Sequence, residues 1–90
     1  MYIWDETKRQ SNIEKHGLDF LDAALMYENP DRCTYLSGRP DESRRLDRAL
    51  VRVHGRVVAL IYTLRGEDVR IISFRVAPRE ERKRHEQDTK

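Results

Sequence analysis

Residues 49–76, ALVRVHGRVVALIYTLRGEDVRIISFRV, form the only dense run of Val, Ile, Leu and aromatic residues in the chain. Polar segments that contain glycine divide this run into three apolar stretches. These stretches predict strands near 49–53, 57–64 and 69–76. Connections of only a few residues join neighbouring antiparallel strands. The run therefore predicts an antiparallel meander around which the rest of the chain is organised.

The last two predicted strands carry apolar residues at both alternating positions. A strand has this pattern when both of its faces are covered, so we expect these two in the middle of the sheet. Three arginines interrupt the same region, at Arg65, Arg70 and Arg75. Because arginine pairs well with anions, this placement indicates that the sheet faces an anionic group.

The amino-terminal segment predicts a short strand and a polar helix. Met1–Trp4 is apolar and short, as an edge strand is. Asp5 is a suitable N-cap for a helix over Glu6–His16, and Gly17 is a suitable residue to end it. The helix has one strongly apolar residue, so it is either a weakly docked surface helix or one held for its polar face. Helical spacing places four polar residues on one side of it: Lys8, Asn12, Lys15 and His16.

The remaining segments complete an α+β pattern. Asp19 predicts the start of a second helix, over Phe20–Glu28, whose apolar stripe is wide enough to lie on a sheet. A strand is expected at Arg32–Leu36 and a last helix over Arg79–Gln87. The last helix has almost no apolar residues, so it should be solvent-exposed, frayed or docked on a partner. We predict an antiparallel sheet of four to five strands with helices on one face, two N-terminal and one C-terminal.

Length and composition exclude several classes of protein. The chain has 90 residues, which is enough for one domain, residues 1–90, and too few for a Rossmann-type nucleotide fold. Its one cysteine excludes an internal disulfide and a multi-cysteine zinc site. Charges begin at the fifth residue, unlike in a signal peptide. No apolar run approaches the roughly 20 residues that span a bilayer. We therefore expect a cytoplasmic protein with no membrane partner.

Charge is distributed unevenly along the chain. Residues 1–31 carry a net charge of −4 and residues 32–90 a net charge of +6. Most of the later positive charge is arginine, whose planar fork suits bidentate contact with phosphate. This asymmetry favours a nucleic acid or an acidic protein as partner. A well-solvated surface rich in arginine explains the same charge equally well.

Three motifs, in order along the chain, resemble a known family. They are WDExK at 4–8 with NxxKHGLxF at 12–20, then YTxRG at 62–66, then RIISxRxA at 70–77 followed by Glu81. Together they are similar to the BrnT toxins of type II toxin–antitoxin systems, over almost the whole chain. An acidic–x–arginine pair of that family would correspond to Glu42 and Arg44.

The resemblance implies a RelE-like ribonuclease fold and a toxin that cleaves RNA and halts translation. It also implies a cognate antitoxin, similar to BrnA, that binds the toxin tightly and represses the shared operon. Operator DNA would then be contacted only through the antitoxin. No cofactor is expected.

RNA cleavage without a metal needs a base for the ribose 2′-OH, cations for the phosphate and an acid for the leaving 5′-oxygen. The three histidines, His16, His54 and His85, are isolated in the sequence, so no metal site is predicted. The 2′-OH is then the expected nucleophile, and DNA should not be cleaved. The candidate catalytic residues are Arg65, Arg75, His16, Lys15 and Glu81. The candidate RNA-binding residues are Lys8, Tyr62, Arg70 and Arg44.

Each candidate also has a structural interpretation. Arg75 and Glu81 could form a salt bridge, Lys15 and His16 could simply complement a helix C-terminus, and Tyr62 could belong to the core. Strict alternation along 69–76 places Arg70 and Arg75 on opposite faces unless a bulge intervenes. An alternative function is a non-catalytic RNA- or protein-binding module that uses the same arginine-rich face.

Overall fold

The computed structural model of the chain describes residues 1–35, 47–53 and 55–88. Its helices are α1 (Glu6–His16), α2 (Ala23–Tyr27) and α3 (Arg79–Asp88), and a short 3-10 helix, η1 (Phe20–Asp22), precedes α2. Its strands are β1 (Tyr2–Ile3), β2 (Cys33–Tyr35), β3 (Asp47–Val53), β4 (Arg56–Arg65) and β5 (Asp68–Val76). This confirms the predicted α+β class. Four residues considered above lie outside the described residues: Leu36, Glu42, Arg44 and His54.

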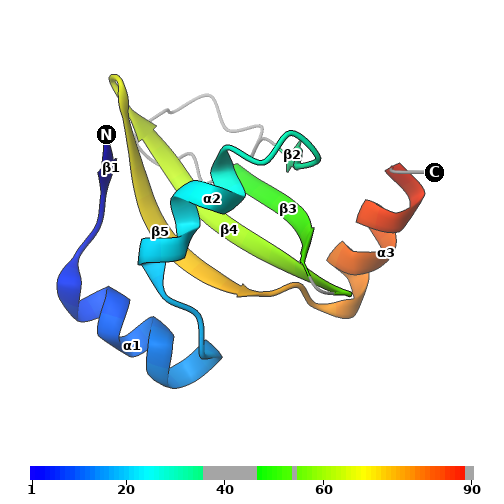
Figure 1. The fold of residues 1–90 in the computed structure, drawn as a ribbon, viewed down its shortest axis with the longest axis horizontal. Coiled ribbons are helices and arrows are strands. Elements are labelled where there is room, and N and C mark those ends of the chain that lie inside the picture. Colours follow the sequence, from blue (N-terminus) through cyan, green and yellow to red (C-terminus); the bar gives the residue numbers. More distant parts are fainter. Residues whose placement is uncertain (36–46, 54, 89–90) are drawn as a thin grey trace.

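The five strands form one sheet in the order β1-β5-β4-β3-β2 (Figure 1). Strands β2 to β5 are the predicted antiparallel meander, and β4 lies in its middle, where both faces are covered. The sheet is not wholly antiparallel, because β1 pairs in parallel with β5, Tyr2 opposite Val69. Because β1 runs parallel to β5, the chain leaves β1 in the direction of the carboxyl-terminal end of β5. Helix α1 therefore lies beside the second half of β5, beyond the end of β1.

A β-bulge interrupts the pairing of β4 with β5. Ile61 pairs with Ser73 and Tyr62 with Ile71, so Ile72 has no partner opposite it. The extra residue reverses the alternation beyond it. Arg70 and Arg75 therefore lie on the same face of the sheet, which is the exception that the prediction allowed if a bulge intervened.

The two faces of the sheet carry separate clusters of buried residues. One face, here called the α2 face, includes Ala49, Val51, Leu60, Ile71 and Phe74 and packs against Phe20 and Ala23. The opposite face, here called the α3 face, includes Leu50, Val57, Ala59 and Ile61 together with Ala77. The register places five arginines on the α3 face: Arg48, Arg52, Arg65, Arg70 and Arg75.

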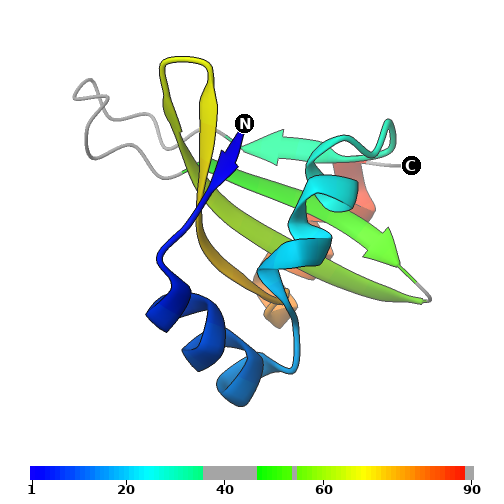
Figure 2. The ribbon, with the colours of Figure 1, turned by 60° about the vertical axis from the view of Figure 1, so that its left-hand side comes forward.

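The helices do not all pack on one face, contrary to the prediction. Helix α2 lies over one face and α3 lies behind the other (Figure 2). Helix α3 is neither frayed nor without contacts, because its carboxylates reach basic residues of the sheet. Glu81 contacts Arg75 and Arg48, and His85 is buried. Polar pairs, which are not evident in a hydropathy pattern, supply the attachment that apolar residues do not.

Helix α1 has the bounds predicted from the sequence. The Asp5 side chain accepts hydrogen bonds from the backbone N–H groups of Thr7 and Lys8 and so caps the first turn. Gly17 ends the helix in the left-handed conformation, φ 69°, and its N–H bonds to the carbonyl of Ile13. The one fully buried residue of α1 is polar, Asn12.

Candidate functional site

Asn12 attaches α1 to the edge of β5. Its Nδ2 donates to the carbonyl of Phe74 (2.7 Å), and its Oδ1 accepts from the N–H of Phe74 (3.1 Å). Nδ2 also donates to the carbonyl of Leu18 (2.8 Å), and the hydroxyl of Ser73 lies 3.5 Å from Oδ1. The side chain thus pairs with β5 as a neighbouring strand would, at a point that β1 does not reach.

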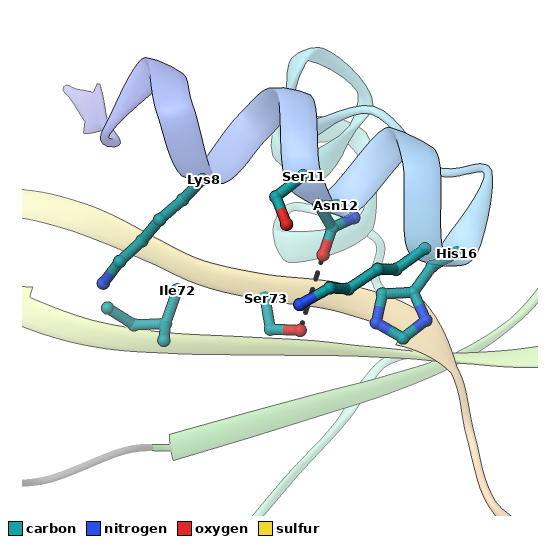
Figure 3. A pocket seen from close by; sticks show the side chains of 7 residues that line it. Lys8, Ser11, Asn12, His16, Ile72 and Ser73 are labelled. Atoms are coloured by element: carbon teal, nitrogen blue, oxygen red, sulfur yellow. Dashed lines mark hydrogen bonds between the residues drawn. The ribbon is translucent and has the colours of Figure 1, made fainter.

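A hollow of about 190 Å³ lies between α1 and β5 beside this contact. Figure 3 shows side chains of α1 pointing toward Ile72 and Ser73 of β5 across the hollow. The Ile72 and Ser73 side chains place it at the β5 edge of the α3 face. Its full lining is Lys8, Ser11, Asn12, Lys15, His16, Ile72 and Ser73.

The lining has the chemistry of an anion-binding site. Lys8, Lys15 and His16 supply nitrogen donors, and the described residues place no carboxylate in the lining. Ser11 and Ser73 add hydroxyl groups, which can donate hydrogen bonds to phosphate oxygens. Lys8 and His16 are eight residues apart, so they lie about 12 Å apart along the helix axis. That length accommodates one phosphate group and part of its neighbour. The predicted common side of α1 is confirmed.

Two arginines flank the hollow on β5. Ser73 is opposite Ile61, whereas Arg70 is opposite Thr63 and Arg75 opposite Ala59. Each arginine is thus two positions along the sheet from the pair Ser73–Ile61, here called the Ser73 row. This is about 7 Å along the strand. Because the bulge brings both to the same face, an extended anionic chain that crosses the hollow passes both guanidinium groups.

Arg75 is already paired in this structure. Its two terminal nitrogens lie 3.0 and 3.2 Å from the two carboxylate oxygens of Glu81. Arg48 of β3 reaches the same carboxylate at 3.2 Å. The salt bridge that the sequence analysis offered as the structural interpretation is therefore present.

Arg65 lies too far from Arg75 to share a phosphate with it. Arg65 is opposite Asp68 at the hairpin end, six positions along β4 from Ala59, the partner of Arg75. The two Cα atoms are therefore separated by about 20 Å along the sheet. The two arginines, both candidate catalytic residues, therefore do not converge on one phosphodiester in this register.

Tyr62 is a core residue in this fold. It is 3% exposed and lies on the α2 face, where its ring and that of Tyr27 pack edge to face with their centroids 5.1 Å apart. Burial raises the pKa of the Tyr62 hydroxyl. A base cannot stack on a ring that other side chains already cover, so the core interpretation accounts for Tyr62.

An ionic cluster around Arg9 attaches α1 to the segment that follows it. The guanidinium of Arg9 donates to both carboxylate oxygens of Asp19, at 2.7 and 3.0 Å, and also to Glu6. These bonds from Arg9 lower the pKa of Asp19 and of Glu6. The cluster ties α1 to Asp19, the residue before η1.

Sequence reasoning missed the contribution of Ser11 and the anchoring role of Asn12. The signal for Asn12 was its place in the middle of a helix, where asparagine is unfavourable unless its side chain has a defined partner. Among the residues that the structure describes, no three His, Cys, Asp or Glu side chains are close enough to hold a metal ion. None of the described helices is long and apolar enough to span a membrane.

The fold and the hollow define a small α+β protein with a basic site for an anionic ligand at the edge of its sheet. Residues 4–81 match the family model of the ribonuclease toxin BrnT of type II toxin–antitoxin systems, and the chain belongs to this family. A comparison with curated proteins finds no match to the chain. Family membership confirms the predicted resemblance. It identifies the protein as a ribonuclease toxin with RNA as target and an antitoxin protein as partner.

Proposed function

We propose that the chain is an endoribonuclease that cleaves RNA without a metal, through attack of a ribose 2′-OH, and so arrests translation. The single observation that carries this proposal is the hollow between α1 and β5, lined by Lys8, Lys15, His16 and two serine hydroxyls. Positive charge and hydrogen-bond donors around one small volume are what a scissile phosphodiester requires.

The roles follow from the chemistry of each side chain. Lys15 and Lys8 stabilise the charge that develops on the phosphate oxygens. His16 moves a proton at the 2′-oxygen or at the leaving 5′-oxygen, because imidazole can both accept and donate near neutral pH. Ser73 orients a phosphate oxygen from the β5 side. The products are a 2′,3′-cyclic phosphate and a free 5′-hydroxyl, since the 2′-oxygen bonds to phosphorus as the 5′-oxygen leaves.

Two arginines of the sheet bind the RNA on the hairpin side of this centre. Arg70 lies on the α3 face two positions from the Ser73 row. Arg65 lies four positions from that row, or about 13 Å, so it contacts the chain further along. A cognate antitoxin of the BrnA type neutralises the toxin, and operator DNA is contacted only through that antitoxin.

Purified protein and a cleavable RNA test this function. Lys15→Ala and His16→Ala should each lower kcat at least 100-fold, whereas Lys83→Ala on the exposed side of α3 should not change it. The same two variants should no longer arrest growth when expressed without an antitoxin. Full cleavage by both variants would show that the hollow is not the catalytic site.

The alternative function is a binding module without catalysis. The exposed arginines of the α3 face support it, because they bind RNA or an acidic protein whether or not a proton is transferred. The two functions differ in the product: a catalyst generates 2′,3′-cyclic phosphate ends, and a binding module leaves the RNA intact.

A further inference from the structure

The carboxylate of Glu81 occupies an unusual position for a helix residue. Three arginine nitrogen atoms lie within 3.2 Å of its two oxygens, two from Arg75 and one from Arg48. The side chain of Glu81 is 16% exposed and that of Arg75 is 24% exposed, so the pair is largely removed from water. Two arginine forks that converge on one pair of anionic oxygens form the arrangement that recognises a phosphate group.

The position of this arginine pair relative to the hollow is equally specific. Arg75 lies on β5 two residues beyond Ser73, on the same face. The strand therefore carries the hollow and the arginine pair about 7 Å apart. Successive phosphates of an extended RNA strand have a similar spacing, so both places can be filled by one chain.

Helix α3 holds Glu81 there through polar contacts. Glu86 lies 3.7 Å from Arg52, and the hydroxyl of Tyr35 donates to Asp88. The one buried side chain of α3 is His85. Lifting α3 takes it away from the buried apolar cluster of the α3 face, and it exchanges the Glu81 carboxylate for a phosphate on the same arginines.

We propose that Arg48 and Arg75 form a second phosphate subsite for RNA, which Glu81 of α3 fills in the free protein. The subsite rests on the proposed function, because it extends the same RNA-binding face. Glu81 then competes with the RNA backbone, and α3 must lift before the RNA occupies both places. Glu81 is a competitor for the arginines in this scheme and takes no part in proton transfer.

Glu81→Gln tests the proposal, with Glu80→Gln as the matched control. Both substitutions remove one negative charge from the first turn of α3, but Glu80 is exposed and contacts no arginine among the pairs that the structure describes. The probe is a 2′-O-methyl RNA octamer, which the enzyme cannot cleave, and binding is followed by fluorescence anisotropy over a range of salt concentrations. All variants are compared below their thermal unfolding transitions.

We expect Glu81→Gln to bind the octamer about tenfold more tightly than Glu80→Gln does. The slope of log K against log salt should steepen by roughly 0.7, the value for one added phosphate contact on a single strand. Adding Arg75→Ala to Glu81→Gln should abolish both gains. Equal affinities for the two glutamine variants would overturn the subsite.

Two further variants keep the test decisive. If Glu81→Gln does not fold, Arg48→Ala replaces it, because Arg48 is exposed on β3; its RNA affinity should fall more than that of Arg56→Ala, at another exposed arginine. Equal losses would refute the subsite.

Lys15→Ala separates the subsite from the proposed catalytic site. If Lys15→Ala binds and cleaves normally while Glu81→Gln still gains affinity, the hollow is not the catalytic site, and the subsite still stands.

Discussion

Asn12 and Phe74 are 62 positions apart in the sequence, yet the side-chain amide of one pairs with both backbone groups of the other. This pairing continues the edge of β5 beyond the end of β1. It also holds the basic side of α1 against β5, the strand that carries Ser73. The site therefore depends on a contact that is made only when the sheet and the first helix have both formed.

Asn12→Ala should lower the free energy of unfolding by about 1–3 kcal/mol, because the buried N–H and carbonyl of Phe74 lose their partner. Hydrogen exchange at the Phe74 amide should accelerate in the variant at temperatures where it remains folded. Ser11→Ala, on the same helix and in the same hollow, is the control and should leave that amide protected. Unchanged protection in Asn12→Ala would show that the amide has another partner.

The Arg9 cluster predicts a specific acid dependence of stability. Arg9 lowers the pKa of Asp19 and Glu6 in the folded state, so the contribution of both groups is fully present above their unfolded pKa values, about 4. It is lost as the pH falls through the lower, folded values. Urea unfolding between pH 6 and pH 2 should show a steeper loss in the wild type than in Arg9→Met. Parallel curves would contradict the assignment.

Metal removal should not change RNA cleavage. The proposed reaction uses Lys15 and His16 for charge and proton transfer, so cleavage should continue at the same rate in excess EDTA. An RNA with one 2′-deoxyribose at the scissile position should resist cleavage at that position only. Loss of activity on chelation, or cleavage of the deoxy substrate, would rule out attack by the 2′-OH.

Arg65→Ala should raise KM and leave kcat nearly unchanged. Arg65 lies at the hairpin end, four positions from the row of Ser73, so in the proposed function it contacts the RNA away from the scissile phosphate. A residue that binds the ground state and the transition state equally affects KM alone. Steady-state cleavage measures the split, with Arg56→Ala at the opposite end of β4 as the control. A large fall in kcat would place Arg65 at the catalytic centre.

Local signals in the sequence predicted much of the fold. Caps at Asp5 and Gly17 gave the bounds of α1, and alternating apolar residues gave the meander. The arrangement of the sheet faces was not predictable in this way. The bulge at Ile72 changes the face of every later residue, and no residue type at that position marks it.

The candidate site was predictable where it depends on one helix. Lys8, Lys15 and His16 share a side of α1 by spacing alone, and the structure brings them together. Their neighbours on β5 were not predictable, because the Asn12–Phe74 pairing that joins the two elements is a tertiary contact. The salt bridge between Arg75 and Glu81 was suggested by their closeness in the sequence. The second arginine on Glu81, Arg48, comes from a different strand, so the sequence did not indicate it.

The central claim is that the hollow between α1 and β5 holds an RNA phosphate. The most direct measurement is an NMR titration of the ¹⁵N-labelled protein with the uncleavable 2′-O-methyl RNA octamer. The account predicts chemical-shift changes concentrated at the amides of Ser11, His16 and Ser73 and at the side-chain amide of Asn12. Changes confined to the exposed leucines Leu21 of η1 and Leu25 of α2, with the hollow unaffected, would contradict it.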